Sequence, residues 1–279
     1  MKKSLLLLVL GILLSGCSGV REKKTGWEED GLEGKVKSIR SVEYKAVEKL
    51  GEATKDLRGD EYITVYNDKG NQVEWSRYNS NGDLENKYVQ KYDKKKNLVE
   101  VCIYSIDNNG FSKLAYMYDD KGNQVEEYAY DANGNLENRY IYEYDNKGNK
   151  VAGNTYYPNG DLECRYINDF DDKGNLVGQN RYDPNGSLTW KSAHTYDDKG
   201  NRIEFRSYNS DGNIAEREVF IYDNKGNMVE INSYNSDGSI RYVNTYNYAY
   251  DITGNWLMKT SYRNGIPTTM EERIIEYYD

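Results

Sequence analysis

The chain has 279 residues, of which 54 are Leu, Ile, Val or Phe, about 19%. Together with 30% charged residues, a mean hydropathy of −0.95 and a net charge of −9, this composition is typical of disordered chains, and the negative charge argues against nucleic acid as a partner. However, 29 tyrosines and four tryptophans supply aromatic surface of high strand propensity, and a single histidine excludes catalysis by a pair of histidines.

Residues 1–16 have the pattern of an export signal. Lys2 and Lys3 precede an apolar run over residues 5–14, which is too short to span a bilayer. The L-S-G-C string that ends at Cys17 resembles the lipobox of bacterial lipoproteins, and the resemblance implies cleavage before Cys17 and a diacylglycerol on its thiol. Cleavage removes two lysines and so changes the net charge from −9 to −11. We therefore expect the lipid, and not charge, to hold the protein on the membrane.

The rest of the chain divides into three parts. Residues 17–31 are polar and predict a lipid-bearing Cys17 followed by a flexible tether. Residues 32–66 predict an N-terminal capping hairpin, and residues 66–279 an array of repeats with a divergent C-terminal cap. With the lipid anchor, this organisation predicts a protein of the bacterial cell envelope, at the outer membrane or the cell surface.

The array repeats every 26 residues. Each unit opens with an aromatic residue, called the anchor below, which begins a Y-D/N-x-K-G-N string, and the last interval is 28. The anchors are Tyr66, Tyr92, Tyr118, Tyr144, Phe170, Tyr196, Tyr222 and Tyr250. Twelve residues after each anchor stands another tyrosine: Tyr78, Tyr104, Tyr130, Tyr156, Tyr182, Tyr208, Tyr234 and Tyr262. A second glycine turn follows most of these tyrosines, so each unit predicts two strands and two turns, as in a β-meander.

The turn strings allow a prediction of register. In Tyr118 to Asn123, a four-residue loop would begin with a side chain that bonds its own backbone and would end on Gly122 at positive φ. Tyr118 would then pair with Asn123, and Tyr116 with Val125. This register predicts a core face with the anchors and the aliphatic residues seven positions after them. It also places on that face a row of strand-start aliphatics: Leu84, Leu136, Leu162, Leu188, Ile214 and Ile240.

The opposite face is predicted to be polar. It carries glutamates such as Glu74 and Glu126, opposed by basic residues such as Lys87 and Arg139, in a solvated ladder of charge pairs. The tyrosines twelve after each anchor fall on this same face, which predicts either a bulge that turns them inward or an exposed aromatic strip.

About 16 strands come from the repeats and two from the N-terminal hairpin. A flat sheet of that size would be about 85 Å across at the usual strand spacing, and open twisted sheets rarely exceed about ten strands. We therefore predict an all-β, antiparallel meander of about 16–18 strands coiled into a spiral sheet or solenoid, with the Tyr/Val face inside. The first hairpin and the last unit would cap its edges.

The recurring Y-x-Y-D-x-x-G-N string resembles the YD repeat of RHS-type bacterial surface proteins. It appears at residues 116–123 and 142–149, and the resemblance spans residues 62–279. It implies strands that wind into a spiral β-sheet. Because the period is 26 and no effector domain follows the repeats in this sequence, we expect kinship with short repeat lipoproteins and not with toxin delivery. MORN-like repeats are a weaker match.

The sequence offers little for catalysis. His194 stands two before an anchor, in a slot that other units fill with unrelated residues, so we expect a core-facing filler. Cys102 and Cys164 lie five strands apart, about 24 Å, which predicts free thiols. Aspartate pairs in the turns are followed by lysine and predict turn capping, with no metal and no cofactor.

Two functions remain open, and neither is enzymatic. In the first, the protein is a non-catalytic binding module whose tyrosines Tyr78, Tyr104, Tyr130, Tyr156, Tyr182, Tyr208 and Tyr234, with Trp75 and Trp190, contact a carbohydrate or protein partner. In the second, the array is a structural spacer or assembly element of the envelope without a small ligand, and the rings are only packed. Exposure of the tyrosines in register would distinguish them.

Overall fold

The computed structural model describes residues 24–105 and 110–279; Cys17 and the predicted signal lie outside the described residues. The described chain forms one short helix and eighteen strands. The elements are α1 (Gly26–Glu29), β1 (Val36–Lys49), β2 (Glu52–Tyr66), β3 (Gln72–Tyr78), β4 (Leu84–Tyr92), β5 (Leu98–Ser105), β6 (Gly110–Tyr118), β7 (Gln124–Tyr130), β8 (Leu136–Tyr144), β9 (Lys150–Tyr156), β10 (Leu162–Phe170), β11 (Leu176–Tyr182), β12 (Leu188–Tyr196), β13 (Arg202–Tyr208), β14 (Ile214–Tyr222), β15 (Met228–Tyr234), β16 (Ile240–Tyr250), β17 (Trp256–Arg263) and β18 (Ile266–Tyr277).

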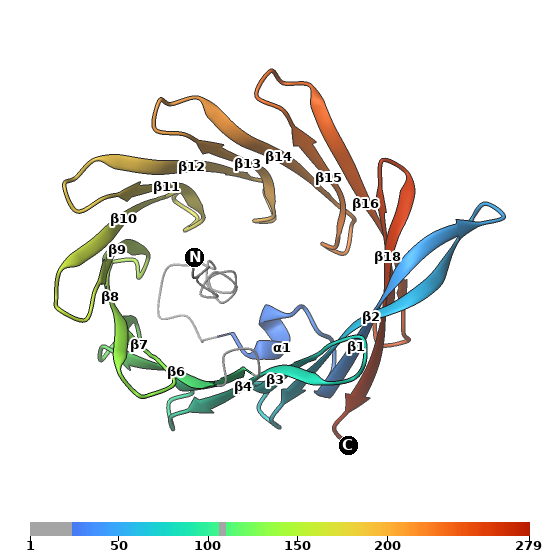
Figure 1. The fold of residues 1–279 in the computed structure, drawn as a ribbon, viewed down its shortest axis with the longest axis horizontal. Coiled ribbons are helices and arrows are strands. Elements are labelled where there is room, and N and C mark those ends of the chain that lie inside the picture. Colours follow the sequence, from blue (N-terminus) through green and yellow to red (C-terminus); the bar gives the residue numbers. More distant parts are fainter. Residues whose placement is uncertain (1–23, 106–109) are drawn as a thin grey trace.

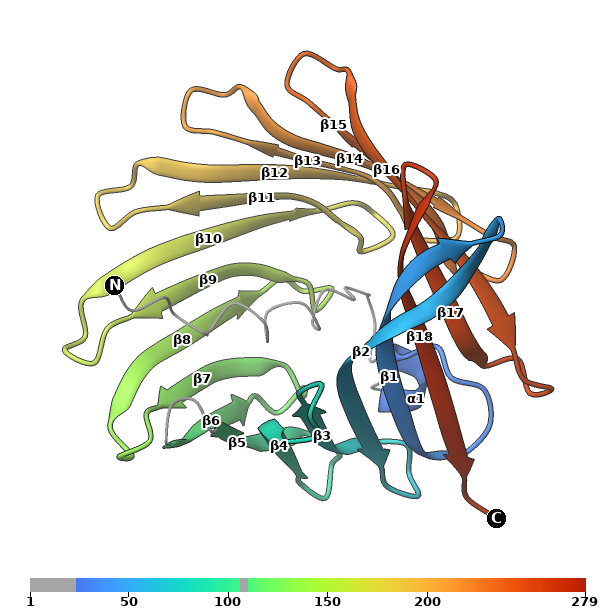
Figure 2. The ribbon, with the colours of Figure 1, turned by 45° about the vertical axis from the view of Figure 1, so that its right-hand side comes forward.

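The strands form a single antiparallel meander that closes on itself. Each strand pairs with the next along the chain, and β1 also pairs with β18, from Val36 opposite Tyr277 to Lys45 opposite Thr269. Figures 1 and 2 show the resulting ring of tilted strands. The prediction of an antiparallel meander of 16–18 strands is confirmed. The prediction of an open spiral or solenoid is wrong, because the first hairpin and the last strand pair with each other instead of capping two edges, and closure into a β-barrel removes every unpaired edge.

The turns after the anchors are tighter than predicted. In the string that follows Tyr118, the Gly122 amide donates to the Asp119 carbonyl at 3.0 Å and the Asp119 amide donates to the Asn123 carbonyl at 2.9 Å. Gly122 has φ +85°, so the loop has three residues and ends on a glycine in the left-handed region. The Asp119 carboxylate accepts from the backbone amides of Lys121 and Asn123, at 3.0 and 2.8 Å, which confirms the turn-capping role.

The predicted register is corrected in two steps that cancel in their effect on the faces. Tyr118 pairs with Gln124 instead of Asn123, and a β-bulge then leaves Val125 unpaired, so that Met117 lies opposite Glu126. Tyr116 therefore pairs with Glu127 instead of Val125. A shift of two residues keeps the side chains of β7 after the bulge on their predicted faces, because side chains alternate with a period of two.

The anchor face lines the inside of the barrel. Figure 1 shows α1 within the ring beside β1 to β4, and the Tyr66 hydroxyl, on the anchor face, donates to the Asp30 carboxylate that follows α1. The Trp27 indole donates to the Val36 carbonyl at 2.6 Å, and Trp27 packs on the buried cluster of Val36, Ile39 and Tyr66. The second half of the predicted tether, residues 24–31, is therefore held against the barrel wall. No helix in the described part of the chain is long and apolar enough to cross a bilayer.

Tyrosine hydroxyls fasten neighbouring strands at the rim that carries the anchor turns. The Tyr118 hydroxyl, at the end of β6, donates to the carbonyl of Leu98, the first residue of β5, at 2.8 Å. The same bond, always to a residue 20 positions earlier, joins Tyr92 to Gln72, Tyr144 to Gln124, Tyr222 to Arg202 and Tyr248 to Met228. Where the anchor is Phe170, which has no hydroxyl, the Asn168 side-chain amide donates instead to the Lys150 carbonyl at 2.8 Å.

This substitution predicts a rescue. Asn168→Ala is expected to lower the free energy of unfolding by about 1–3 kcal/mol, because it leaves the Lys150 carbonyl and the Gln179 amide that bonds Asn168 without partners. Adding Phe170→Tyr should restore a large part of the loss, because its hydroxyl would reach the same carbonyl as the other anchors do. Urea unfolding of the wild type, both single variants and the double variant measures this; purely additive effects would contradict it.

Candidate functional site

The seven predicted tyrosines lie at the ends of the odd-numbered strands β3 to β15, at the rim opposite the anchor turns; six are the last residue of their strand, and Tyr104 is the last but one in β5. Strand alternation places Tyr130 on the same face as Glu126, and this face points out of the barrel. Because these tyrosines occupy alternate strands, they stand about 10 Å apart around the barrel. Tyr104 is 46% exposed and the other six predicted tyrosines are half-buried. The bulges do not turn them inward, so the structure brings Tyr78, Tyr104, Tyr130, Tyr156, Tyr182, Tyr208 and Tyr234 together as one outer row.

Each tyrosine in this row has an aliphatic or aromatic residue directly opposite on the following strand. Tyr130 pairs with Leu136, Tyr182 with Leu188 and Tyr234 with Ile240. Leu188 is 39% and Ile240 58% exposed. The prediction that this aliphatic row belongs to the core face is therefore wrong, because the bulge at each strand start brings these residues opposite the outer tyrosines. We call the seven tyrosines and these strand-start residues the rim band; its members on the following strands are Leu84, Phe111, Leu136, Leu162, Leu188, Ile214 and Ile240.

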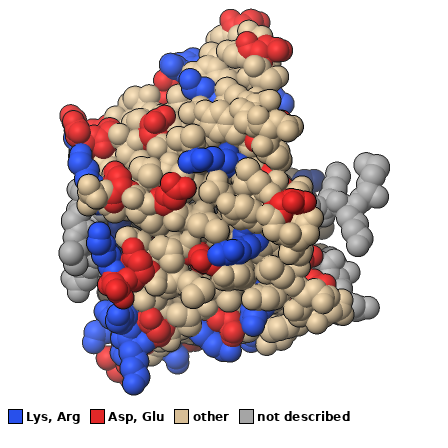
Figure 3. Space-filling model, turned by 90° about the vertical axis from the view of Figure 1, so that its left-hand side faces the viewer, with Lys and Arg blue, Asp and Glu red and all other residues tan. Residues whose placement is uncertain are grey.

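Basic residues cover the tyrosines from the other side. The Lys113 ammonium lies 4.9 Å from the Tyr130 ring centroid, and the Arg217 guanidinium 4.3 Å from that of Tyr234. These cations also belong to the predicted charge ladder, since Arg217 bonds Glu204 at 2.7 Å. The ladder is further confirmed by ion pairs of Lys87 with Glu74 and of Arg139 with Glu126. Figure 3 shows acidic and basic side chains side by side on the outer surface. Exposed pairs of this kind contribute a few tenths of a kcal/mol each.

The inner face carries aromatic residues of its own. Trp75 lies between Tyr62 and Tyr88 on three adjacent strands, with ring centroids 5.8 and 5.1 Å apart. Further along the wall, Tyr116 and Tyr140 pack against the buried cluster of Val101, Leu114 and Ala129. Trp75, which the sequence suggested as a companion of the outer tyrosines, therefore faces the interior and does not join the rim band.

A group of three titratable side chains on the inner face was missed by the sequence analysis. The Tyr142 hydroxyl donates to the Glu127 carboxylate at 2.9 Å, and the Lys150 ammonium lies 3.8 Å from the Tyr142 ring centroid. Burial raises the pKa of Glu127, and burial lowers the pKa of Lys150 to about 8. A signal was present in the sequence: the slots of Glu127 and Lys150 hold neutral residues in most other repeats, such as Trp75 and Val101, or Gln72 and Leu98.

His194 lies where the sequence placed it, on the inner face. Its Nε2 is 3.0 Å from the Ser192 hydroxyl, and its ring packs 5.3 Å from that of Phe205. Burial, aided by the charge of Arg202, lowers the pKa of His194 to about 4, so the ring is neutral at pH 7. His194 also lines a depression of about 410 Å³ between the turns at Asp171 and Asp197.

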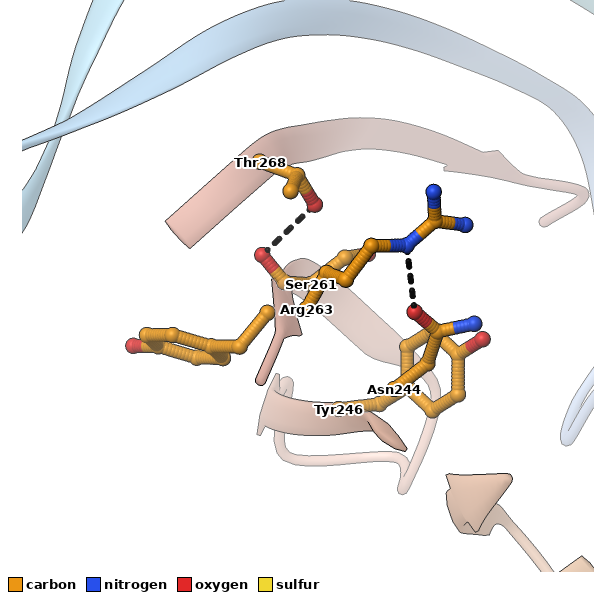
Figure 4. A pocket seen from close by; sticks show the side chains of 6 residues that line it. Asn244, Tyr246, Ser261, Arg263 and Thr268 are labelled. Atoms are coloured by element: carbon orange, nitrogen blue, oxygen red, sulfur yellow. Dashed lines mark hydrogen bonds between the residues drawn. The ribbon is translucent and has the colours of Figure 1, made fainter. Parts of the chain in front are cut away.

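A second depression, of about 340 Å³, lies over β16, β17 and the start of β18 (Figure 4). The Arg263 guanidinium donates to the Asn244 side-chain carbonyl at 3.2 Å, and the Thr268 hydroxyl donates to the Ser261 backbone carbonyl at 3.1 Å. Tyr246 contributes its ring to the wall. The Asn244 carbonyl and the Thr268 hydroxyl are therefore already paired within the depression.

The cysteines of residues 24–105 and 110–279 lie apart from one another. Cys102 and Cys164 are both buried free thiols, as predicted. No group of three or more His, Cys, Asp or Glu side chains in this part of the chain is arranged to hold a metal ion.

Comparison with known proteins finds likeness in structure only. No family model and no curated protein matches the chain. A porin-like protein from Bacteroides uniformis ATCC 8492 is similar over 86% of this chain and 96% of its own, with 12% identity and a TM-score of 0.46. TcdB2-TccC3 without its hypervariable C-terminal region is similar over 85% of this chain and 16% of its own, with 10% identity and a TM-score of 0.33.

A putative outer membrane lipoprotein-sorting protein domain from Vibrio parahaemolyticus is also similar, over 86% of this chain and 85% of its own. Its identity is 7% and its TM-score 0.23. TM-scores this low carry no argument, so the description of the barrel rests on the strand pairing of the chain itself.

The lowered pKa of Lys150 predicts a pH dependence of stability. Because the folded state holds fewer protons than the unfolded state between about pH 8 and the ordinary lysine pKa near 10.4, the free energy of unfolding contributed by this group rises with pH through that window. Lys150→Met should therefore be more stable than the wild type at pH 7, by about 1–2 kcal/mol, and the difference should shrink by pH 10. Urea unfolding at both pH values measures it; a constant difference would contradict the shift.

Proposed function

We propose that this chain is a lipid-anchored protein of the bacterial cell envelope that acts as a non-catalytic binding module, with the rim band as its contact surface for a carbohydrate or a protein. The observation that supports this proposal is the band itself. It places seven tyrosines beside partly exposed aliphatic residues around one rim, where Leu188, Ile240 and Phe111 are 39%, 58% and 40% exposed. Tyrosine is among the side chains in which binding interfaces are enriched.

The position of α1 supports an orientation of the barrel. The Trp27 amide donates to the Gly70 carbonyl at 3.2 Å, and the Glu33 amide donates to the Asn255 side chain at 2.8 Å, so this segment lies at the rim of the anchor turns. Only six residues lie between Cys17 and Lys24, so the seven steps from one to the other reach at most about 25 Å. A lipid on Cys17 would hold the anchor-turn rim near the membrane, and the rim band would face away from it toward a partner.

The alternative function, a structural spacer or assembly element, has an observation of its own. Lys113, Lys191 and Arg217 already lie over Tyr130, Tyr208 and Tyr234, with centroid distances of 4.9, 5.9 and 4.3 Å. A ring covered by a cation on one side offers less surface for stacking a ligand. Under this alternative, the tyrosines only pack against the cations of the outer charge ladder and contact no ligand.

A triple variant of the band separates the two functions. Tyr130→Ala/Tyr156→Ala/Tyr182→Ala, made in the chain that lacks residues 1–17, is expected to weaken binding to glycan-array or envelope-protein ligands by at least about tenfold, ~1.4 kcal/mol. The matched control is Met117→Ala/Ile221→Ala, which alters outer residues that are 54% and 44% exposed at the other rim. Equal loss in both variants, or no ligand for the wild type on either array, would favour the spacer.

The anchor is tested separately. Cys17→Ser is expected to abolish incorporation of an alkyne-tagged fatty acid into the full chain expressed in a bacterium, and to move the protein from the membrane fraction to the soluble fraction. Cys102→Ser serves as the control, because that thiol is buried in β5. Labelling that persists in Cys17→Ser would contradict the lipid assignment.

A further inference from the structure

Lys150 is the first residue of β9, and its ammonium lies over an aromatic ring on the inner wall. The Nζ atom is 3.8 Å from the Tyr142 ring centroid. Among the described residues it forms no ion pair, since no carboxylate oxygen there lies within 4.0 Å of it. This sets it apart from the outer cations, such as Lys87 and Arg139, whose charges are matched by glutamates. An amine held in this way has its nitrogen directed to the interior without a carboxylate in contact.

Gly153 leaves room for the Tyr142 ring that lies under this amine. Tyr142 lies opposite Gly153, and a Cβ at that position would stand 3.2 Å from Tyr142 Cδ1, closer than ordinary contact. In the other repeats the slot of Gly153 carries a side chain, for example Trp75 or Val101. The glycine therefore makes room for the Tyr142 ring against the wall, and with it a platform for Lys150.

A carboxyl group is fixed at the far end of the same ring. Glu127 Oε2 accepts from the Tyr142 hydroxyl at 2.9 Å and from the Gln124 side-chain amide at 3.2 Å. Glu127 lies in β7, Tyr142 in β8, and Lys150 and Gly153 in β9, which are three neighbouring strands. Tyr116 and Tyr140 line the wall beside them. An amine, a phenol and a carboxyl thus lie together in an aromatic setting, whereas a repeat array spreads its residues evenly.

We propose that Lys150 is a covalent attachment site in the barrel interior for a ligand that bears an aldehyde, which it holds as an imine. This site is separate from the rim band and does not rest on the function proposed for it. Amines in apolar surroundings beside an acid are the groups that proteins use for imine formation.

The step balances without an oxidant or reductant. The unprotonated Nζ attacks the carbonyl carbon, a C–N bond forms, and the carbonyl oxygen becomes a hydroxyl group as the proton moves to it from nitrogen. The carbinolamine then loses this hydroxyl as water, with a proton from Glu127 relayed through the Tyr142 hydroxyl, and nitrogen returns a proton as the C=N bond forms. Burial favours the required forms of both groups, because it lowers the pKa of Lys150 to about 8 and raises that of Glu127.

The test compares lysines within one folded protein. The full chain is treated with a limiting amount of benzaldehyde and sodium cyanoborohydride at pH 7.5, and modified lysines are located by peptide mass spectrometry. A pKa of about 8 gives a neutral fraction about a hundredfold above that of an ordinary lysine, and lower nucleophilicity reduces the expected advantage to about tenfold. Lys147, three residues earlier with a side chain 54% exposed, is the reference.

Lys150 is expected to be modified about ten times faster than Lys147. Glu127→Gln removes the acid that assists loss of water and also the group whose charge raises the pKa of Lys150, so a slower reaction at Lys150, with the rate at Lys147 unchanged, would report the acid role of the carboxyl. A Lys150 rate equal to or below that of Lys147 in the wild type would overturn the proposal, and this comparison needs no variant to fold. A Lys150 advantage that persists in a folded Glu127→Gln protein would overturn the role of the carboxyl.

Discussion

The barrel depends on one recurring hydrogen bond between a tyrosine hydroxyl and a backbone carbonyl of the neighbouring strand. Where two strands are joined by the second turn of a repeat, their other ends lie at the opposite rim without a turn between them. There the Tyr118 hydroxyl, like its counterparts, donates to the backbone carbonyl of the first residue of the preceding strand. The bulge beside each anchor disturbs the regular ladder at this place, so the side-chain bond supplies a partner that the backbone does not. The repeat of Phe170 fits this account, because Phe170 is accompanied by Asn168, which bonds the equivalent carbonyl.

The same pattern separates the molecule into two chemically different surfaces. Outside, glutamates and basic residues alternate with tyrosines, and charges such as Lys87 and Arg139 have a partner on the neighbouring strand. Inside, aromatic rings and the amine of Lys150 lie on the wall of the ring within which α1 also lies. A chain with few aliphatic residues can build this structure because tyrosine serves both surfaces, with an apolar ring for packing and a hydroxyl for bonding.

Local features of the candidate sites follow from the sequence with little ambiguity. The period of two places Tyr130 and Glu126 on one face whatever the turn, and the Asp and Gly positions of the turn string specify a tight reversal. The sequence did not reveal that Leu188 and Ile240 leave the core face, because one extra residue in a bulge changes the pairing without a mark in composition. Nor did it bring Glu127, Tyr142 and Lys150 together, since Glu127 and Lys150 each look like an isolated departure from the repeat and Tyr142 fills a slot that other repeats also fill with tyrosine.

The sequence by itself determined the strands, their antiparallel order and, outside the bulges at the strand starts, which side chains share a face, because these depend on contacts between residues fewer than about thirty positions apart. Only the tertiary structure decided that the sheet closes. Closure depends on β1 meeting β18, with Ile39 opposite Ile275 across more than 200 residues, and no local pattern encodes that distance. The physical reason is geometric: twist and bulges accumulate over eighteen strands until two unpaired edges meet, and the hydrogen bonds gained there favour a barrel over an open spiral.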